Sequence, residues 1–220
     1  MNDQEIFDAL KKARESTPKR KFSQTVDLIV SLKQLDLKKP EQNVNTFIAL
    51  PHQRGKKLKI CALVDKELFN SGKEACDRVI MKDEFSKFDK KSLRKLALEY
   101  DFFIAQANLM PDIAKYMGKK LGTKGKMPNP KAGCVVPPSA NLKDLYGTLQ
   151  KTIRLQTKNE LAVKCPVGNE AMSDDDLKDN ILAVYNILLR VLPKEKHNIK
   201  EAMLKLTMGP AIGIGAKDEM

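Results

Sequence analysis

RVIM at residues 78–81 and DFFIA at residues 101–105 are short apolar runs that alternate with segments of helical apolar spacing. Short apolar runs between helices are typical of buried strands in a parallel sheet that helices cover. From about Asp65 onward, the sequence therefore predicts a parallel-sheet segment within a protein of the α/β class. The helices of this segment are expected at residues 69–76, 84–98 and 110–121.

Strands and helices are also predicted on both sides of this middle segment. A first helix can be capped by Asn2 or Asp3 and ends at Thr17-Pro18, and a later helix begins at Ser173 and stops at Pro193. The segment 122–138 contains four prolines and three glycines, which predicts a long loop. Strands are expected at residues 22–33, 46–50, 58–64, 152–157, 160–164 and 201–207.

The charge balance points to an anionic partner. The chain of 220 residues has 40 Lys and Arg against 28 Asp and Glu, a formal charge of +12. The excess is clustered, because residues 113–143 carry seven lysines and no acidic residue. An evenly solvated surface would not concentrate charge in this way. Nucleic acid is the commonest partner of so basic a domain.

The sequence lacks the residue patterns that an enzyme, a metal site or a membrane span would need. The four cysteines lie far apart and form no CxxC pair, and only His52 and His197 are present, so neither a zinc site nor a catalytic triad is expected. Gly125-Lys126 lacks the rest of a phosphate-binding loop. Asp174, Asp175 and Asp176 are interpreted as helix-start residues. We expect no enzyme, no cofactor, no metal, no secretory signal and no membrane span.

The known sequence patterns of RNA modules fit poorly. Residues 122–125 match the GxxG loop of a KH domain, but Pro128 and Pro130 obstruct the helix that should follow. The 12 aromatic residues do not form an RRM motif. With these modules disfavoured, the remaining mode is recognition of RNA through its backbone, its shape and its 2′-hydroxyls. Residues 19–22 and 207–210 suit it, although composition alone favours a simple strand that ends in a turn for the second segment.

Several motifs then coincide in order along residues 19–210. They are Lys21-Phe22 with residues 25–27, residues 42–44, residues 50–52 with Gly55-Lys56, Leu121-Gly122 with Gly125, and residues 128–133, 166–168 and 207–210. As a set they resemble the ribosomal protein L-one family, in its archaeal form. The resemblance implies two domains. An α/β sandwich formed by both termini (residues 1–66 and 152–220) would carry an inserted, small Rossmann-like α/β domain (residues 67–151).

The resemblance also implies a function. Members of this family bind the stalk of large-subunit ribosomal RNA beside the tRNA exit site, take part in release of deacylated tRNA, and often repress translation of their own messenger RNA. The chain is thus expected to be a cytoplasmic constituent of the large ribosomal subunit and a monomer when free. The alternative is a nonspecific basic nucleic-acid-binding protein.

The family motifs, carried over to this chain, predict which residues contact RNA. The principal contacts are Lys21, Phe22, Thr25, Thr207, Met208 and Gly209. Lysines of the inserted domain are expected to add supporting contacts: Lys119, Lys120, Lys124, Lys126 and Lys131. The sequence departs from the family at Ser23-Gln24, where an acidic pair is common, and in the more basic loop that includes Thr123 and Met127.

Overall fold

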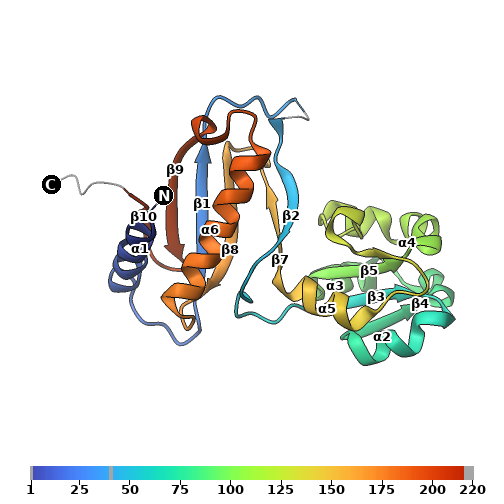
Figure 1. Ribbon diagram of the computed structural model, residues 1–220. Coiled ribbons are helices and arrows are strands. Elements are labelled where there is room, and N and C mark those ends of the chain that lie inside the picture. The colour runs from blue at the N-terminus through green and yellow to red at the C-terminus, as the bar shows by residue number, and fades with distance from the viewer. Residues whose placement is uncertain (1, 40–41, 216–220) are drawn as a thin grey trace. The chain divides into compact units, whose positions relative to one another are not determined.

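The computed structural model describes residues 2–39 and 42–215, and the chain divides into two compact units (Figure 1). Unit 1 comprises Met1–Lys56 and Lys151–Met220, and unit 2 comprises Lys57–Gln150. The sequence-based boundary after residue 66 would place strand β3 (Ile60–Val64) in the first domain. In the structure β3 pairs with β4 (Arg78–Met81), so it belongs to the inserted unit.

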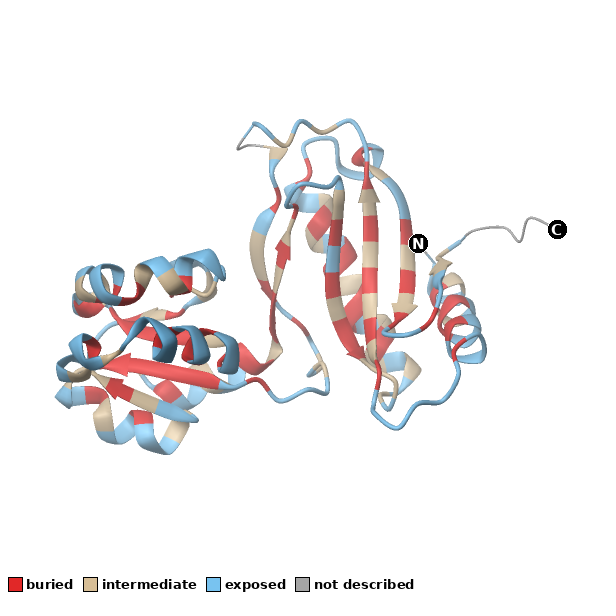
Figure 2. Cartoon of the chain, turned by 180° about the vertical axis from the view of Figure 1, so that it is seen from behind, coloured by how far each residue is buried: buried red, intermediate tan, exposed pale blue. Residues whose placement is uncertain are grey.

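Unit 1 is built on a four-stranded antiparallel sheet in the order β10-β9-β1-β8. Alternate residues of β1 are buried, and they face the two long helices, of which α1 contacts β9 and α6 contacts β8. Figure 2 shows the other face of the sheet, which no described helix of unit 1 covers. The bounds are α1 Asp3–Glu15, β1 Thr25–Leu32, β8 Ala162–Asn169, α6 Asp174–Val191, β9 Ile199–Leu206 and β10 Ala211–Gly213.

Both long helices of unit 1 begin where the sequence predicts. The backbone N–H of Asn2 donates to Glu5 Oε2 at 2.8 Å, as in a capping box. At the start of α6, the Ser173 hydroxyl accepts from the N–H of Asp176 at 3.2 Å. A separate antiparallel pair, β2 (Asn45–Ala49) with β7 (Thr152–Gln156), completes unit 1.

Unit 2 is the predicted parallel sheet, in the order β4-β3-β5-β6, where β5 is Phe102–Gln106 and β6 is Val135–Val136. Neighbouring residues of β3 belong to two different apolar clusters, which lie on opposite faces of the sheet. Helices α3 (Lys90–Glu99) and α4 (Met110–Thr123) supply one cluster. The other cluster packs under α5 (Leu142–Lys151) and the end of α2 (Phe69–Ala75). Strands buried on both faces explain the apolar runs of the middle segment.

Three predicted elements differ from the structure, and two elements of the structure were not predicted. The helix expected at residues 84–98 is divided into a 3₁₀ helix (Lys82–Lys87) and α3, because Phe88 is extended between them. The loop expected at residues 122–138 contains β6, and α5 follows it, a helix that was not predicted. Strand β8 starts later than expected and continues through Pro166. A proline is tolerated there because β8 is an edge strand and has a bulge opposite Val26 and Asp27. Strand β10 was also missed.

Candidate nucleic-acid interface

Predicted site residues from the two ends of the chain meet at one end of the sheet, where the inner strand β1 begins and the inner strand β9 ends. This end of the sheet is called the edge below. The Thr207 hydroxyl accepts from the N–H of Thr25 at 3.0 Å and lies 3.4 Å from the Thr25 carbonyl oxygen. The N–H of Thr207 donates to the same carbonyl at 3.1 Å. These contacts join residues that are 182 positions apart in the sequence. Thr207 is itself exposed, so its hydroxyl has a remaining lone pair on the surface.

Met208 and Phe22 present large apolar side chains to solvent, Met208 directly after Thr207 and Phe22 three residues before Thr25. Met208 is 55% exposed and Phe22 is 51% exposed, whereas the other Phe and Met side chains of the described residues are buried or partly buried. The backbone of Met208 is fixed, since its N–H donates to the Gln24 side-chain oxygen at 3.1 Å. Exposed apolar side chains on an ordered backbone are suited to contact with ribose or base surfaces.

Gly209 is buried, and its missing side chain would point into the protein. A β-carbon built on Gly209 would meet Thr17 Oγ1 well inside the 3.0 Å that real β-carbons keep. The Thr17 hydroxyl is itself held by the Ala13 carbonyl at 2.7 Å. Gly209 is one of the predicted RNA contacts, where the bare backbone of a glycine would let RNA approach closely. The structure provides a second reason for glycine, which is its packing against the end of α1.

The basic residues that precede β1 surround this edge. Lys21 is exposed, and Lys19 and Arg20 line a cavity of about 310 Å³ together with Arg14, Thr17 and Gln24. Arg14 is already paired, with Asp174 Oδ1 at 2.8 Å. The cavity is also lined by one carboxylate, that of Glu170, so Lys19 and Arg20 leave an excess of one positive charge, which would attract a polyanion.

One carboxyl group lies on the sheet close to the site. Asp27 on β1 is opposite Lys205 on β9, two residues along each strand from the Thr25–Thr207 contact. Partial burial raises the pKa of Asp27 above its ordinary value, and the positive charge of Lys205 opposes that shift.

The supporting lysines of unit 2 are not equivalent. Lys120 and Lys124 line a groove of about 260 Å³ with Arg94 and Thr123, so α3 and α4 bring three cations together. None of the three cations forms an ion pair with the described residues. Lys126 is different, because its ammonium donates to the Tyr100 carbonyl at 2.7 Å. Lys119 and Lys131 are exposed outside the groove.

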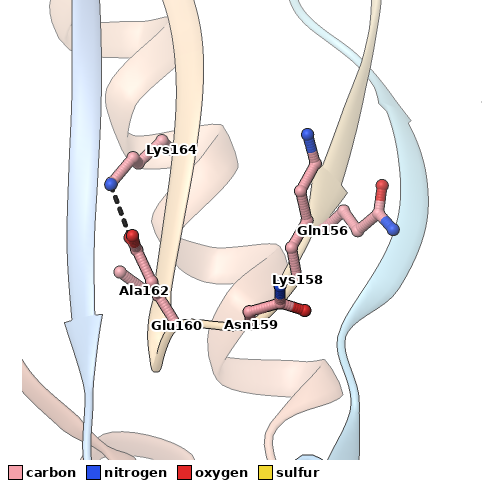
Figure 3. A pocket seen from close by; sticks show the side chains of 6 residues that line it. All are labelled: Gln156, Lys158, Asn159, Glu160, Ala162 and Lys164. Carbon is pink, nitrogen blue, oxygen red and sulfur yellow. Dashed lines mark hydrogen bonds and ion pairs between the residues drawn. The ribbon is translucent and has the colours of Figure 1, made fainter. Parts of the chain in front are cut away.

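A further cavity of about 350 Å³ lies at the connection between β7 and β8 (Figure 3). Its polar lining includes an ion pair of Lys164 with Glu160 at 2.6 Å, and no predicted site residue lines it.

Burial raises the pKa of all four thiols, to about 12 for Cys61 and Cys165 and to about 11 for Cys76 and Cys134. Thiols with such pKa values are poor nucleophiles and poor metal ligands near neutral pH. Among residues 2–39 and 42–215, no cluster of His, Cys, Asp and Glu could hold a metal ion. Within the same ranges, no helix is long and apolar enough to cross a membrane.

Sequence reasoning missed three residues that shape these surfaces. Gln24 was noted only as a departure from the family pattern, and Thr17 only as the end of a helix. Their spacing from Met208 and Gly209 gives no local signal, since each contact joins opposite ends of the chain. Arg94 lies within the helix expected at residues 84–98 and was not singled out. Its position beside α4 could be found only from the packing of the two helices.

Together the fold and the exposed edge define a basic, two-unit α/β protein whose candidate interface is built from both ends of the chain. Residues 10–210 match the model of the Ribosomal protein L1p/L10e family. The chain therefore belongs to this family of ribosomal proteins, which are structural proteins and not enzymes.

Archaeal relatives extend the match over nearly the whole chain. The large ribosomal subunit protein uL1 of Methanocaldococcus jannaschii is 42% identical over 216 residues, which cover 97% of this chain and 96% of the relative. The protein of the same name from Pyrococcus abyssi is 40% identical over 96% of this chain and 95% of its own length. That of Nanoarchaeum equitans is 41% identical over 94% of this chain and 98% of its own length. These similarities confirm the predicted archaeal-type family membership.

Proposed function

We propose that this chain is a constituent of the large ribosomal subunit in the cytoplasm and binds the stalk of the large-subunit ribosomal RNA. The observation that carries the proposal is the edge where the Thr207 hydroxyl meets the Thr25 backbone, beside the exposed Met208. The names of the archaeal relatives, which are large-subunit proteins, support the same assignment.

The edge would recognise RNA by its sugar surface and shape. The free lone pair of Thr207 can accept from a ribose 2′-hydroxyl, and Met208 and Phe22 can pack against ribose or an unstacked base. Lys21 and its basic neighbours would hold the phosphates and position the RNA, without reading its sequence. Because the sugar contacts need a 2′-hydroxyl, the edge would bind a folded RNA more tightly than a DNA duplex, which lacks this group.

Unit 2 would add phosphate contacts through the groove of Arg94, Lys120 and Lys124. Three cations without a protein counter-ion repel one another, and a phosphate group lowers that repulsion. Lys119 and Lys131 would add weaker contacts. We assign Lys126 the smallest share, because its ammonium is bound to the Tyr100 carbonyl.

Two finer roles rest on the family resemblance. Bound at the stalk, the protein would contact the tRNA at the exit site and assist release of deacylated tRNA. A messenger RNA of its own that presents the same shape as the stalk would bind the same edge, and its translation would be repressed. We propose that the free protein is a monomer, so both roles compete for one RNA-binding edge.

The alternative is a basic protein that binds any nucleic acid through phosphate contacts. The two functions differ in the result of a competition experiment, since phosphate contacts alone discriminate little between sequences.

The deciding experiment is filter binding of a labelled stalk RNA fragment across a salt series, with duplex DNA and unrelated RNA as competitors. If about six phosphates are neutralised, log K falls with log salt with a slope of magnitude about 4 to 5. Tight binding that resists both competitors supports the proposal. Equal displacement by every competitor leaves only a nonspecific basic protein.

A further inference from the structure

We propose that Gln24 is a positioning residue, which holds the turn at residues 207–209 in its RNA-binding shape before RNA is bound. This inference rests on the proposed function of that turn. Gln24 does not itself contact solvent, since only 1% of it is exposed. Its effect on RNA would be transmitted through the backbone of Met208.

Gln24 connects three segments of the chain. Its side-chain oxygen accepts from the N–H of Met208 at 3.1 Å, and its side-chain nitrogen lies 3.5 Å from the Pro18 carbonyl. Its backbone carbonyl accepts from the N–H of Glu170 at 2.9 Å. One buried residue thus ties the turn after β9 to the segment after α1 and to the turn after β8.

The surroundings of Gln24 explain why the turn needs this support. The cavity of about 310 Å³ lined by Thr17 and Gln24 also reaches Leu206, the last residue of β9. Space next to a turn allows it to take other conformations. Beyond Leu206, the described hydrogen bonds and contacts that place the turn are those of Thr207 with Thr25, of Met208 with Gln24, of the Gly209 N–H with Leu206, and of Gly209 with Thr17.

Preorganisation is the physical benefit. Met208 is more than half exposed, so without an anchor its backbone would sample several arrangements and would lose that freedom on RNA binding. An anchor that is present in the free protein removes this cost from the binding step. The expected signature is a change in affinity without any change in the number of phosphates contacted.

The test uses Gln24→Ala in the full chain, with Asn180→Ala as a matched control. Asn180 is also a fully buried amide of unit 1 that joins backbone groups, as it accepts from the N–H of His52 at 3.0 Å and donates to the Val167 carbonyl at 2.8 Å. Both variants lose a buried amide, but only one of these amides contacts the turn. A purely structural role would make the two variants alike.

Two readouts are needed, one on the free protein and one with labelled stalk RNA. Amide hydrogen exchange of the free protein should show the Met208 N–H exchanging about tenfold faster in Gln24→Ala and unchanged in Asn180→Ala. Stalk RNA should bind about tenfold more weakly to Gln24→Ala, with the salt slope of the unaltered protein. Gln24→Glu keeps an acceptor for Met208 and should restore the slow exchange.

The outcomes separate this inference from the proposed function. Unchanged Met208 exchange in folded Gln24→Ala overturns the positioning role, whatever the RNA result. Equal losses of affinity in Gln24→Ala and Asn180→Ala also overturn it. If the unaltered protein shows no preference for stalk RNA, the proposed function fails, and the exchange measurement still decides whether Gln24 orders the turn.

Discussion

The Thr207 hydroxyl accepts a hydrogen bond from the backbone N–H of Thr25 at 3.0 Å, and this contact joins the first strand of the chain to its last long strand. The same hydroxyl lies 3.4 Å from the Thr25 carbonyl, so it closes the ladder between β1 and β9 at its end. The Thr207 hydroxyl therefore has a structural role at this edge, in addition to the RNA contact that we propose for it.

Thr207→Ser and Thr207→Ala test whether the Thr207 hydroxyl is needed for RNA binding. Serine keeps the hydroxyl, so it should bind stalk RNA nearly as well as the unaltered protein. Alanine leaves the Thr25 N–H without its partner and should weaken binding by about 1–3 kcal/mol. Filter binding measures both, with circular dichroism to establish folding. Equal affinities of the alanine variant and the unaltered protein would remove Thr207 from the site.

Met208→Ala tests the exposed apolar side chain in the same assay. Removing a side chain that packs against RNA should cost about 1–3 kcal/mol of binding free energy. Because Met208 is 55% exposed in the free protein, the Tm should change little. Normal RNA affinity in this variant would mean that the side chain is not at the interface.

Gly209→Ala tests whether this glycine serves packing or RNA approach. The new β-carbon would collide with Thr17 Oγ1, so the free energy of unfolding should fall by about 1–3 kcal/mol. The double variant with Thr17→Ala removes the colliding hydroxyl and leaves the nearest Thr17 atom, its β-carbon, at 3.3 Å. Most of the stability should then return, as measured by urea unfolding.

Stalk RNA binding by the same double variant distinguishes the two reasons for Gly209. If internal packing is the reason, affinity recovers along with stability. If stability recovers and affinity does not, RNA requires the bare backbone at this position. Thr17→Ala alone is the control for loss of the hydrogen bond to the Ala13 carbonyl.

The groove of unit 2 predicts a change in salt dependence. Arg94→Gln combined with Lys120→Gln should lower the magnitude of the salt slope by about 1–2, because up to two phosphate contacts are lost. Lys90→Gln with Lys91→Gln removes the same charge from exposed positions of α3 outside the groove. If the two double variants have the same slope, the groove binds no phosphate.

Asp27→Asn should stabilise the protein at neutral pH. The folded pKa of Asp27 is raised by burial, so its ionisation disfavours the folded state as pH rises from about 4 through the raised value. At pH 7 the Tm of the variant should exceed that of the unaltered protein, and the difference should vanish near pH 3. A Tm difference that is independent of pH would contradict this assignment of the charge.

Local patterns predicted much of the fold, and contacts between distant segments account for the rest. The strands at residues 78–81 and 101–105 were predictable because burial on both sheet faces gives continuous apolar runs. The helix α5 was missed although Asn141 gives a start signal, with its side-chain oxygen accepting from the N–H of Lys143 at 3.1 Å. Strand β6 has only two residues, which are too few for any periodicity.

The candidate site shows the same limit. Family motifs pointed to Thr25, Thr207 and Met208, and the structure brings Thr25 and Thr207 together. No periodicity could reveal that Gln24 anchors Met208, because the two lie 184 positions apart and neither belongs to a repeating pattern. The boundary between the units was expected too late for a related reason. The sequence of β3 would fit a buried strand in the sheet of either unit. Only its pairing with β4 assigns it to unit 2.

The most direct test of the RNA-binding edge is hydrogen exchange of the full chain, free and with the stalk RNA fragment. Slower exchange is predicted in peptides that cover residues 19–25 and 205–210 together, because both ends of the chain form one surface. The peptides of the β7–β8 connection, at residues 156–164, should be unchanged. Protection confined to unit 2, or spread equally over all basic segments, would contradict an interface built from the two ends of the chain.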